Sequence, residues 1–174
     1  FGDDNPGGKL PYTVYESVRQ IPPQTEYDIT KGFTYLYFTG QPLFPFGHGL
    51  SYTTFAYRHL ELSAPEISAQ GKTEVRLEVE NTGQRSGDEV VQLYVHAVAG
   101  RVKRPLKELR GFQRVHLQPG EKRRLTFSLP ADQLAFYDVQ THSFVVDPGS
   151  YNVLIGSSSA DIRLTGRLKV IGAP

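Results

Sequence analysis

The sequence predicts a mainly β protein: an immunoglobulin-like antiparallel β-sandwich over residues 49–174, preceded by an irregular extension over residues 1–48. From Tyr52 onward, short runs of alternating apolar and polar residues are separated by turns rich in Gly, Pro, Asn and Ser. No segment of this part has helical periodicity over three turns. The runs amount to about seven or eight strands over about 120 residues, which is the size and turn spacing of an immunoglobulin-like sandwich.

The extension starts with a turn-rich string, Phe1–Gly8, which contains Asp-Asp-Asn-Pro-Gly-Gly. As a calcium loop this string is incomplete. Asp3, Asn5 and Gly8 match positions one, three and six, but the residue at position twelve is Val14 rather than Glu. A turn is therefore favoured over a metal site.

Two short β-type runs follow, Tyr12–Tyr15 and Phe33–Thr39. Because a lone pair of strands is marginal in water, these residues need a partner surface. The second run is dense enough in aromatic rings to be considered for a sugar site. In a strand its aromatic side chains would lie on both faces, so that both faces are expected to be buried. An interdomain core is therefore favoured for Phe33, Tyr35, Tyr37 and Phe38.

A connector, Gln41–Thr53, joins the extension to the sandwich. Its two prolines and two glycines stop helix and strand alike, while its apolar side chains provide anchors. We therefore expect Phe44 and Phe46 to be buried between the extension and the sandwich. The domain boundary is placed after His48.

Within the sandwich, alternation assigns the side chains of the core. The segment Val90–Val95 is apolar in both phases apart from Gln92, as expected for a central strand covered on both sides. Further strands are expected at Phe55–Leu62, at 109–117 and at Phe144–Val146. Tyr151, which follows a Pro-Gly turn, fits either a tyrosine corner or a merely packed tyrosine. The nine positions expected inside are Val75, Leu77, Val79, Leu125, Phe127, Val153, Ile155, Leu164 and Leu168.

The connector also carries a family resemblance. Pro42–Thr53, with the sequence Pro-Leu-Phe-Pro-Phe-Gly-His-Gly-Leu-Ser-Tyr-Thr, resembles a segment of glycoside hydrolase family 3 enzymes of the β-glucosidase and β-xylosidase kind. In these enzymes it leads from an α/β sandwich domain into a C-terminal fibronectin type III-like domain. Further motifs resemble the same family in the same order: Asn5–Pro11, Tyr27–Gly32, Gly87–Val95, Arg104–Phe112 and Leu134–Asp138.

The resemblance covers essentially the whole chain, but only the last part of such an enzyme. It implies that residues 1–48 are the tail of the α/β sandwich domain plus the connector, and that residues 49–174 are a fibronectin type III-like domain. The expected partners are the upstream catalytic domains of the same parent and, through the parent, a β-linked oligosaccharide or glycoside.

Retaining glycoside hydrolysis requires two carboxyl groups about 5–5.5 Å apart that flank the scissile bond. Of the candidate carboxylates, Asp3 and Asp88 lie beside Gly, where Asp commonly caps turns. The resemblance implies that the nucleophile, an Asp, and the acid/base, a Glu, both lie upstream of the matched motifs. No catalytic residue is therefore assigned, and the substrate-binding residues stay open. The candidates considered are Asp3, Asp4, Asp28, Asp88, Glu89, Asp138 and Asp161.

No metal or cofactor is expected. The histidines never occur at the i, i+2 or i, i+4 spacing that would place two of them on one face. His48, between two glycines, indicates a hydrogen-bonded structural histidine. The chain has no cysteine, no Gly-x-Ser-x-Gly elbow and no Gly-rich phosphate loop. The five histidines are His48, His59, His96, His116 and His142.

Basic residues gather in two clusters, but acidic residues are as numerous along the chain, and its formal charge is +1. A solvated face with salt bridges to the neighbouring domain is therefore favoured over an anionic partner. The small net charge gives no electrostatic case for nucleic acid or a membrane surface, and no run of about eighteen apolar residues could span a bilayer. Neither nucleic acid nor a membrane is therefore expected as a partner. The clusters are Arg101, Lys103, Arg104, Lys107 and Arg110, and Lys122, Arg123 and Arg124.

Residues 1–11 have neither a basic flank nor an apolar stretch, so that no signal peptide is expected and the chain is expected to be a cut piece of a longer protein. The absence of cysteine leaves the compartment undecided, with the periplasm and secretion both open for the parent.

Two functions of different classes follow from the sequence. The favoured one is a non-catalytic C-terminal module that braces the catalytic domains of a retaining family 3 β-glycosidase and is inactive alone. The alternative is a free-standing immunoglobulin-like module for carbohydrate binding or adhesion. The first fifty residues discriminate between them, because an independent module has no use for an aromatic, irregular extension.

Overall fold

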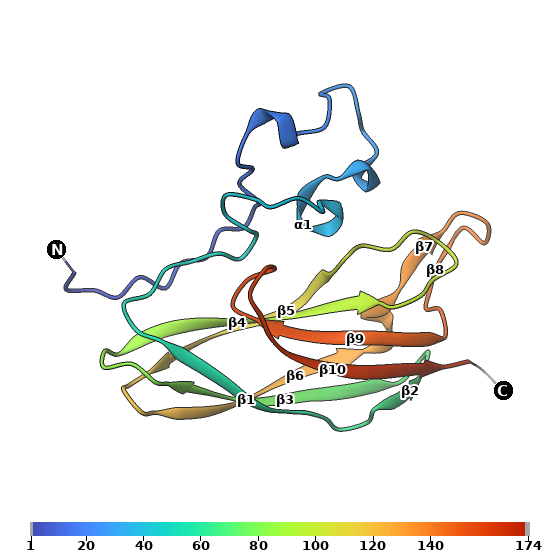
Figure 1. Cartoon of the computed structure of the whole chain (residues 1–174). Helices are drawn as coiled ribbons and strands as arrows, with labels where there is room; N and C mark the ends of the chain where they lie inside the picture. Colours follow the sequence, from blue (N-terminus) through green and yellow to red (C-terminus); the bar gives the residue numbers. More distant parts are fainter. Residues whose placement is uncertain (1, 173–174) are drawn as a thin grey trace.

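Two β-sheets pack face to face in the computed structural model, which describes residues 2–172 (Figure 1). One sheet has the strand order β1-β3-β6 and the other the order β2-β10-β9-β4-β5. The strands are β1 (Phe55–Leu62), β2 (Glu66–Ser68), β3 (Lys72–Asn81), β4 (Gly87–Ala97), β5 (Glu108–Leu117), β6 (Lys122–Pro130), β7 (Phe136–Asp138), β8 (Ser143–Val145), β9 (Gly149–Gly156) and β10 (Ile162–Ile171).

The architecture confirms the predicted mainly β sandwich. Neighbouring strands are antiparallel, except that β2 pairs in parallel with β10. Strands β7 and β8 form a separate hairpin. The ten strands among the described residues exceed the expected number, because β2 and β7 are only three residues long and too short to show alternation.

The core between the two sheets is the one that the alternation predicts. Eight of the nine predicted positions are buried, and Leu164 is partly buried against the same cluster. Tyr151 forms a tyrosine corner, since its hydroxyl donates to the carbonyl oxygen of Asp147 at 2.7 Å. The period-two pattern therefore located the core correctly.

The extension differs from the prediction. Of the run Tyr12–Tyr15, only Val14 pairs, in an isolated bridge with Phe44. The run Phe33–Thr39 is not a strand, because its middle forms the single helical turn α1 (Thr34–Tyr37). Aromatic residues favour strands only where a neighbouring strand can pair with them, and this run meets the sandwich through its side chains and through the Leu36 carbonyl oxygen, which accepts from the Leu106 backbone N–H at 2.7 Å. The other helical elements are the 3-10 turns η1 (Val18–Gln20), η2 (Ile29–Lys31) and η3 (Ala131–Leu134).

The connector is only partly buried. Phe44 is 40% exposed, which contradicts the prediction, because its ring stacks on His48 at the surface with the ring centroids 5.0 Å apart. Phe46 is half-buried and stacks on Tyr35 at 4.2 Å. Phe46 is therefore the better anchored of the two, although it is only half-buried and not buried as predicted.

Asn81 holds together the end of the sandwich where the chain enters from the connector. Its side chain is fully buried, and its Nδ2 donates to the carbonyl oxygens of Arg85 at 2.7 Å and Leu117 at 2.9 Å. Its Oδ1 accepts from the Thr53 hydroxyl at 2.7 Å and from the Gly83 backbone N–H at 3.1 Å. All four hydrogen-bonding positions of the amide are used.

We expect Asn81→Ala to lower the free energy of unfolding by about 2–4 kcal/mol, because several buried partners lose their hydrogen bonds at once. Urea unfolding of the chain measures this loss. Asn152→Ala, at a half-buried position of β9, serves as the control and should cost less than about 1 kcal/mol. Equal costs for the two variants would contradict the proposed role of Asn81.

Candidate functional site

The N-terminal segment (residues 2–53) covers the outer face of β4 and is joined to the sandwich by hydrogen bonds between distant parts of the chain (Figure 1). Because Val91, Leu93 and Val95 point into the core, alternation places Gln92 and Tyr94 on this outer face. Both are nevertheless buried, at 3% and 0% exposure. The prediction of a central strand covered on both sides is therefore confirmed.

Gln92 links the two parts. Its Nε2 donates to the carbonyl oxygens of Gly47 in the connector at 3.2 Å and of Ser157 in the β9–β10 loop at 2.6 Å. Its Oε1 accepts from the hydroxyl of Tyr94. The one polar residue of an otherwise apolar run thus satisfies backbone groups of two loops.

The glycines on both sides of His48 are required by close approaches. Gly47 has a φ of +80°, and a Cβ there would lie 2.1 Å from Oε1 of Gln92. A Cβ on Gly49 would lie 2.3 Å from the carbonyl oxygen of Gly8. Between them, the carbonyl oxygen of His48 accepts from the Leu10 backbone N–H at 2.8 Å. His48 is therefore structural through its backbone, whereas the prediction placed the hydrogen bond on the histidine without naming the atom.

Asn5 fixes the start of the segment. Its Oδ1 accepts from the backbone N–H of Tyr52 at 2.8 Å and from the Ser51 hydroxyl at 3.1 Å. Its Nδ2 donates to the carbonyl oxygen of Ser86 at 3.1 Å, which ties the segment to the turn before β4. Asn5 therefore clamps the segment to the sandwich, whereas the turn predicted for the Asn-Pro-Gly-Gly string is not formed, because residues 5–8 have neither a turn nor a bend.

A buried ion pair adds a charged contact. Lys9 Nζ lies 3.1 Å from Oε1 of Glu89, whose residue is only 4% exposed. The same oxygen accepts from the backbone N–H of Val90 at 2.8 Å. A buried carboxylate that lost its partner would be strongly destabilising. The stability of β4 therefore depends on Lys9 of the N-terminal segment.

The aromatic residues of the extension contact the sandwich. Tyr35 meets Tyr94 edge to face at 6.0 Å, and its hydroxyl accepts from the backbone N–H of Leu109 at 3.1 Å. Burial raises the pKa of the Tyr35 hydroxyl. Lys103 Nζ lies 5.5 Å from the centroid of the Tyr37 ring and donates to the Thr30 carbonyl oxygen. The interpretation of these rings as packing groups agrees with these contacts.

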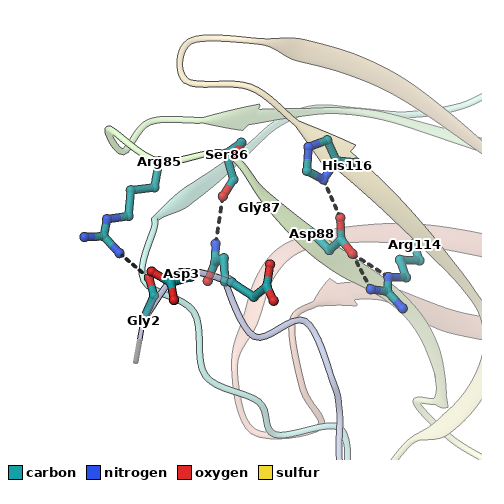
Figure 2. Close-up of a pocket in the computed structure, with 10 residues that line it drawn as sticks. Gly2, Asp3, Arg85, Ser86, Gly87, Asp88, Arg114 and His116 are labelled. Carbon is teal, nitrogen blue, oxygen red and sulfur yellow. Dashed lines mark hydrogen bonds and ion pairs between the residues drawn. The ribbon is translucent and has the colours of Figure 1, made fainter.

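A polar pocket of about 670 Å³ lies where the first residues meet the ends of β4 and β5 (Figure 2). Asp88 faces it and binds the Arg114 guanidinium and, at 2.7 Å, the His116 Nδ1. The hydrogen bond from Arg114 lowers the pKa of Asp88, so that this carboxyl is held ionised rather than poised as an acid. Asp3 and Asp4 line the same pocket.

The other carboxylate candidates have structural partners. Asp28 caps η2 by accepting from the Thr30 backbone N–H at 2.9 Å. Asp138 accepts from the Gln140 backbone N–H at 2.9 Å and pairs with Arg101. Asp161 accepts from the hydroxyl of Ser157 and pairs with an arginine. These contacts are those of turn and cap residues, although none of the three aspartates lies directly beside Gly or Pro.

The basic clusters are paired within the chain. Arg101 binds two aspartates, and Arg104 and Arg110 both bind Glu108. Lys107 Nζ donates to the Ser159 carbonyl oxygen at 2.6 Å, and burial lowers the pKa of this lysine. In the second cluster, lysine and arginine pair with glutamates of β3 and of the β5–β6 turn. Several members of both clusters thus form ion pairs inside this chain, and salt bridges to a neighbouring domain stay a prediction.

No group of three or more His, Cys, Asp or Glu side chains within residues 2–172 could hold a metal ion. None of the helices that the structure describes is long and apolar enough to span a bilayer.

The chain is a β-sandwich module whose strand β4 is covered by an irregular N-terminal segment through buried polar contacts. Residues 1–52 match the family model of the glycosyl hydrolase family 3 C-terminal domain, and residues 89–159 match that of the fibronectin type III-like domain. The chain therefore belongs to glycosyl hydrolase family 3 and corresponds to a C-terminal part of its members.

The relatives agree. The chain is 40% identical to a putative beta-xylosidase of Formosa agariphila, over 95% of this chain and 22% of the relative. It is 39% identical to a periplasmic beta-glucosidase of Salmonella typhimurium, over 94% and 23%. A beta-glucosidase structure from Bifidobacterium adolescentis superposes with a TM-score of 0.89 at 30% identity, over 98% of this chain and 27% of that one. The chain thus spans about a quarter or less of the length of these relatives.

We expect Gln92→Leu to lower the free energy of unfolding by about 2–3 kcal/mol, because the buried carbonyl oxygens of Gly47 and Ser157 lose their donor. Urea unfolding measures this cost. Gln118→Leu, at an exposed position, is the matched control and should be near neutral. A neutral Gln92→Leu would show that the segment does not depend on this amide.

Stability should also fall in acid. The pKa values of Asp88 and Asp161 are lowered by arginine side chains, and those of Glu121 and Asp138 by backbone N–H groups. A carboxyl whose pKa is lowered by folding stabilises the protein above its unfolded pKa, and this contribution is lost as the pH falls through the folded pKa. We expect the melting temperature to decrease below about pH 4. A melting temperature that stays level down to about pH 2.5 would contradict this.

Proposed function

We propose that this chain is the non-catalytic C-terminal module of a longer family 3 β-glycosidase, the parent, which hydrolyses β-glucosides or β-xylosides. The module braces the parent's catalytic domains. The observation that carries this proposal is the buried attachment of the N-terminal segment to the sandwich through Gln92, Lys9 and Asn5. Because this segment matches the model of the glycosyl hydrolase family 3 C-terminal domain, the attachment sets the position of the sandwich relative to that domain.

The outward side of the segment supports the proposal. Several large apolar side chains there are exposed, including Val18 at 81% and Tyr27 at 89%. Apolar side chains gathered on one surface mark an interaction site, and the rest of the hydrolase domain would cover them. A free-standing carbohydrate-binding or adhesive module would leave them in water, so that this alternative is disfavoured.

The domain division is part of the proposal. Residues 1–48 are assigned to the tail of the α/β sandwich domain plus the connector, and residues 49–174 to the fibronectin type III-like domain. The buried contacts cross this boundary, since Gly47 and Lys9 lie on one side of it and Gln92 and Glu89 on the other. The two parts are therefore expected to fold as one unit.

The purified chain should not cleave aryl β-glucosides or β-xylosides, because retaining hydrolysis needs an acid and a nucleophile on opposite sides of one sugar and the proposed parent holds both upstream. The parent carrying Gln92→Leu should keep its fold but lose activity, since a 1 Å misplacement can cost on the order of a hundredfold in rate.

Assays of both glycosides with the chain, the parent, the Gln92→Leu parent and the parent truncated before Gly49 test the proposal. Turnover by the chain alone would overturn the non-catalytic assignment. Full activity of the truncated parent would remove the bracing role. Gln118→Leu in the parent controls for a nonspecific loss of activity.

A further inference from the structure

A cleft of about 920 Å³ opens beside the attachment surface, between the N-terminal segment and one end of the sandwich. Ile29, Leu36 and Tyr37 of the segment form one wall. The β4–β5 loop (residues 98–107) and the β7–β8 hairpin form the other. The hairpin lies at this end of the sandwich on the same side as α1 (Figure 1).

The guanidinium groups of the cleft are engaged inside the chain. Arg101 pairs with Asp138 at 2.8 Å and with Asp147 at 3.0 Å. Arg104 donates to the Leu134 carbonyl oxygen at 3.0 Å, and both guanidiniums lie over the ring of Phe136, at 5.3 and 4.8 Å. An anionic ligand would have to break these contacts, so the cleft does not favour a charged partner.

The rim of the cleft carries large apolar side chains that are exposed to solvent. Tyr137 and Phe144 meet edge to face at 5.4 Å and are 50% and 75% exposed. Val139 at the tip of the hairpin is 72% exposed, and Val102 across from it 44%. Exposed aromatic and aliphatic side chains with a polar surround are the usual composition of a protein interface.

The neighbouring wall indicates what covers this rim. The N-terminal segment, which forms this wall, matches the glycosyl hydrolase family 3 C-terminal domain over residues 1–52. The relatives are about four times as long as this chain. The remainder of that domain must adjoin the segment, whose exposed Ile29 lines the same cleft. The apolar rim is therefore continuous with a surface that the upstream polypeptide has to reach.

We propose that Val102, Tyr137, Val139 and Phe144 form a second docking surface, which binds the upstream part of the same polypeptide directly. This inference rests on the proposed function and deepens it. The module would hold the catalytic domains at two separate places, through its covalently linked segment and through the hairpin. The cleft fits an apolar protein segment because its rim offers apolar side-chain area and its guanidinium groups are already engaged inside the chain.

Hydrogen exchange of the parent and of this chain tests the proposal. Peptides that contain residues 136–145 should exchange at least about tenfold more slowly in the parent than in the chain. Phe144→Ser should lower the melting temperature of the parent by about 3 °C or more and leave that of the chain within about 1 °C, because this ring is exposed in the chain. Phe112→Ser, at a 66% exposed position of β5 outside the cleft, is the matched control and should have no such parent-specific effect.

The outcomes separate the two proposals. If residues 12–29 are protected in the parent but residues 136–145 are not, the second docking surface is wrong and the bracing function stands. If neither is protected, both proposals fail. If the hairpin is protected in the isolated chain and this protection rises with protein concentration, the rim binds a second copy of the chain. Protection of the chain by xylo- or gluco-oligosaccharides would assign it to a glycan, and either result would overturn the proposed occupant.

Discussion

The structure depends on the satisfaction of the polar groups on the outer face of β4. Gln92 and Tyr94 are buried on this face, while the opposite face forms the core, and Glu89, which is in phase with Val91, is buried near the start of the strand. Buried amides and carboxylates are costly unless each has a partner, and their partners here come from residues outside the sandwich strands, including Gly47 and Lys9. Without the N-terminal segment, the outer face of β4 would be exposed to solvent and its buried polar side chains would lose hydrogen-bonding and ionic partners.

The alternation of side chains predicted the core because each sandwich strand has one face toward the other sheet. The same reasoning failed for Phe33–Thr39, where the aromatic content suggested a strand but a helical turn formed. A strand is specified by its neighbours, and this segment has no strand beside it to supply a ladder. Phe44 was misplaced for a similar reason, since composition shows that a connector is anchored but not which of two phenylalanines anchors it.

The polar contacts could be predicted only in part. Gln92 stood out in sequence as the one polar residue of an apolar run, and Asn5, Gly47 and Gly49 stood out through the family resemblance. Their partners are up to 81 residues distant in the chain, as for Asn5 and Ser86, and no local pattern identifies such pairs. The pairing of Lys9 with Glu89 was missed because each charge by itself is typical of a solvated strand face.

These contacts bear on how a module without catalytic groups could affect catalysis. A flexible connector would leave two domains free to change their relative position, whereas a connector whose Gly47 is fixed against β4 leaves few such motions. A second contact at the β7–β8 hairpin would resist rotation about the first, because one attachment surface permits rocking and two separated ones do not. The value of such rigidity lies in the geometry of a retaining site, where two carboxyl groups have to stay about 5–5.5 Å apart on either side of a sugar. The buried amide of Gln92 would then contribute to the reaction only through the position of the domains that carry these groups.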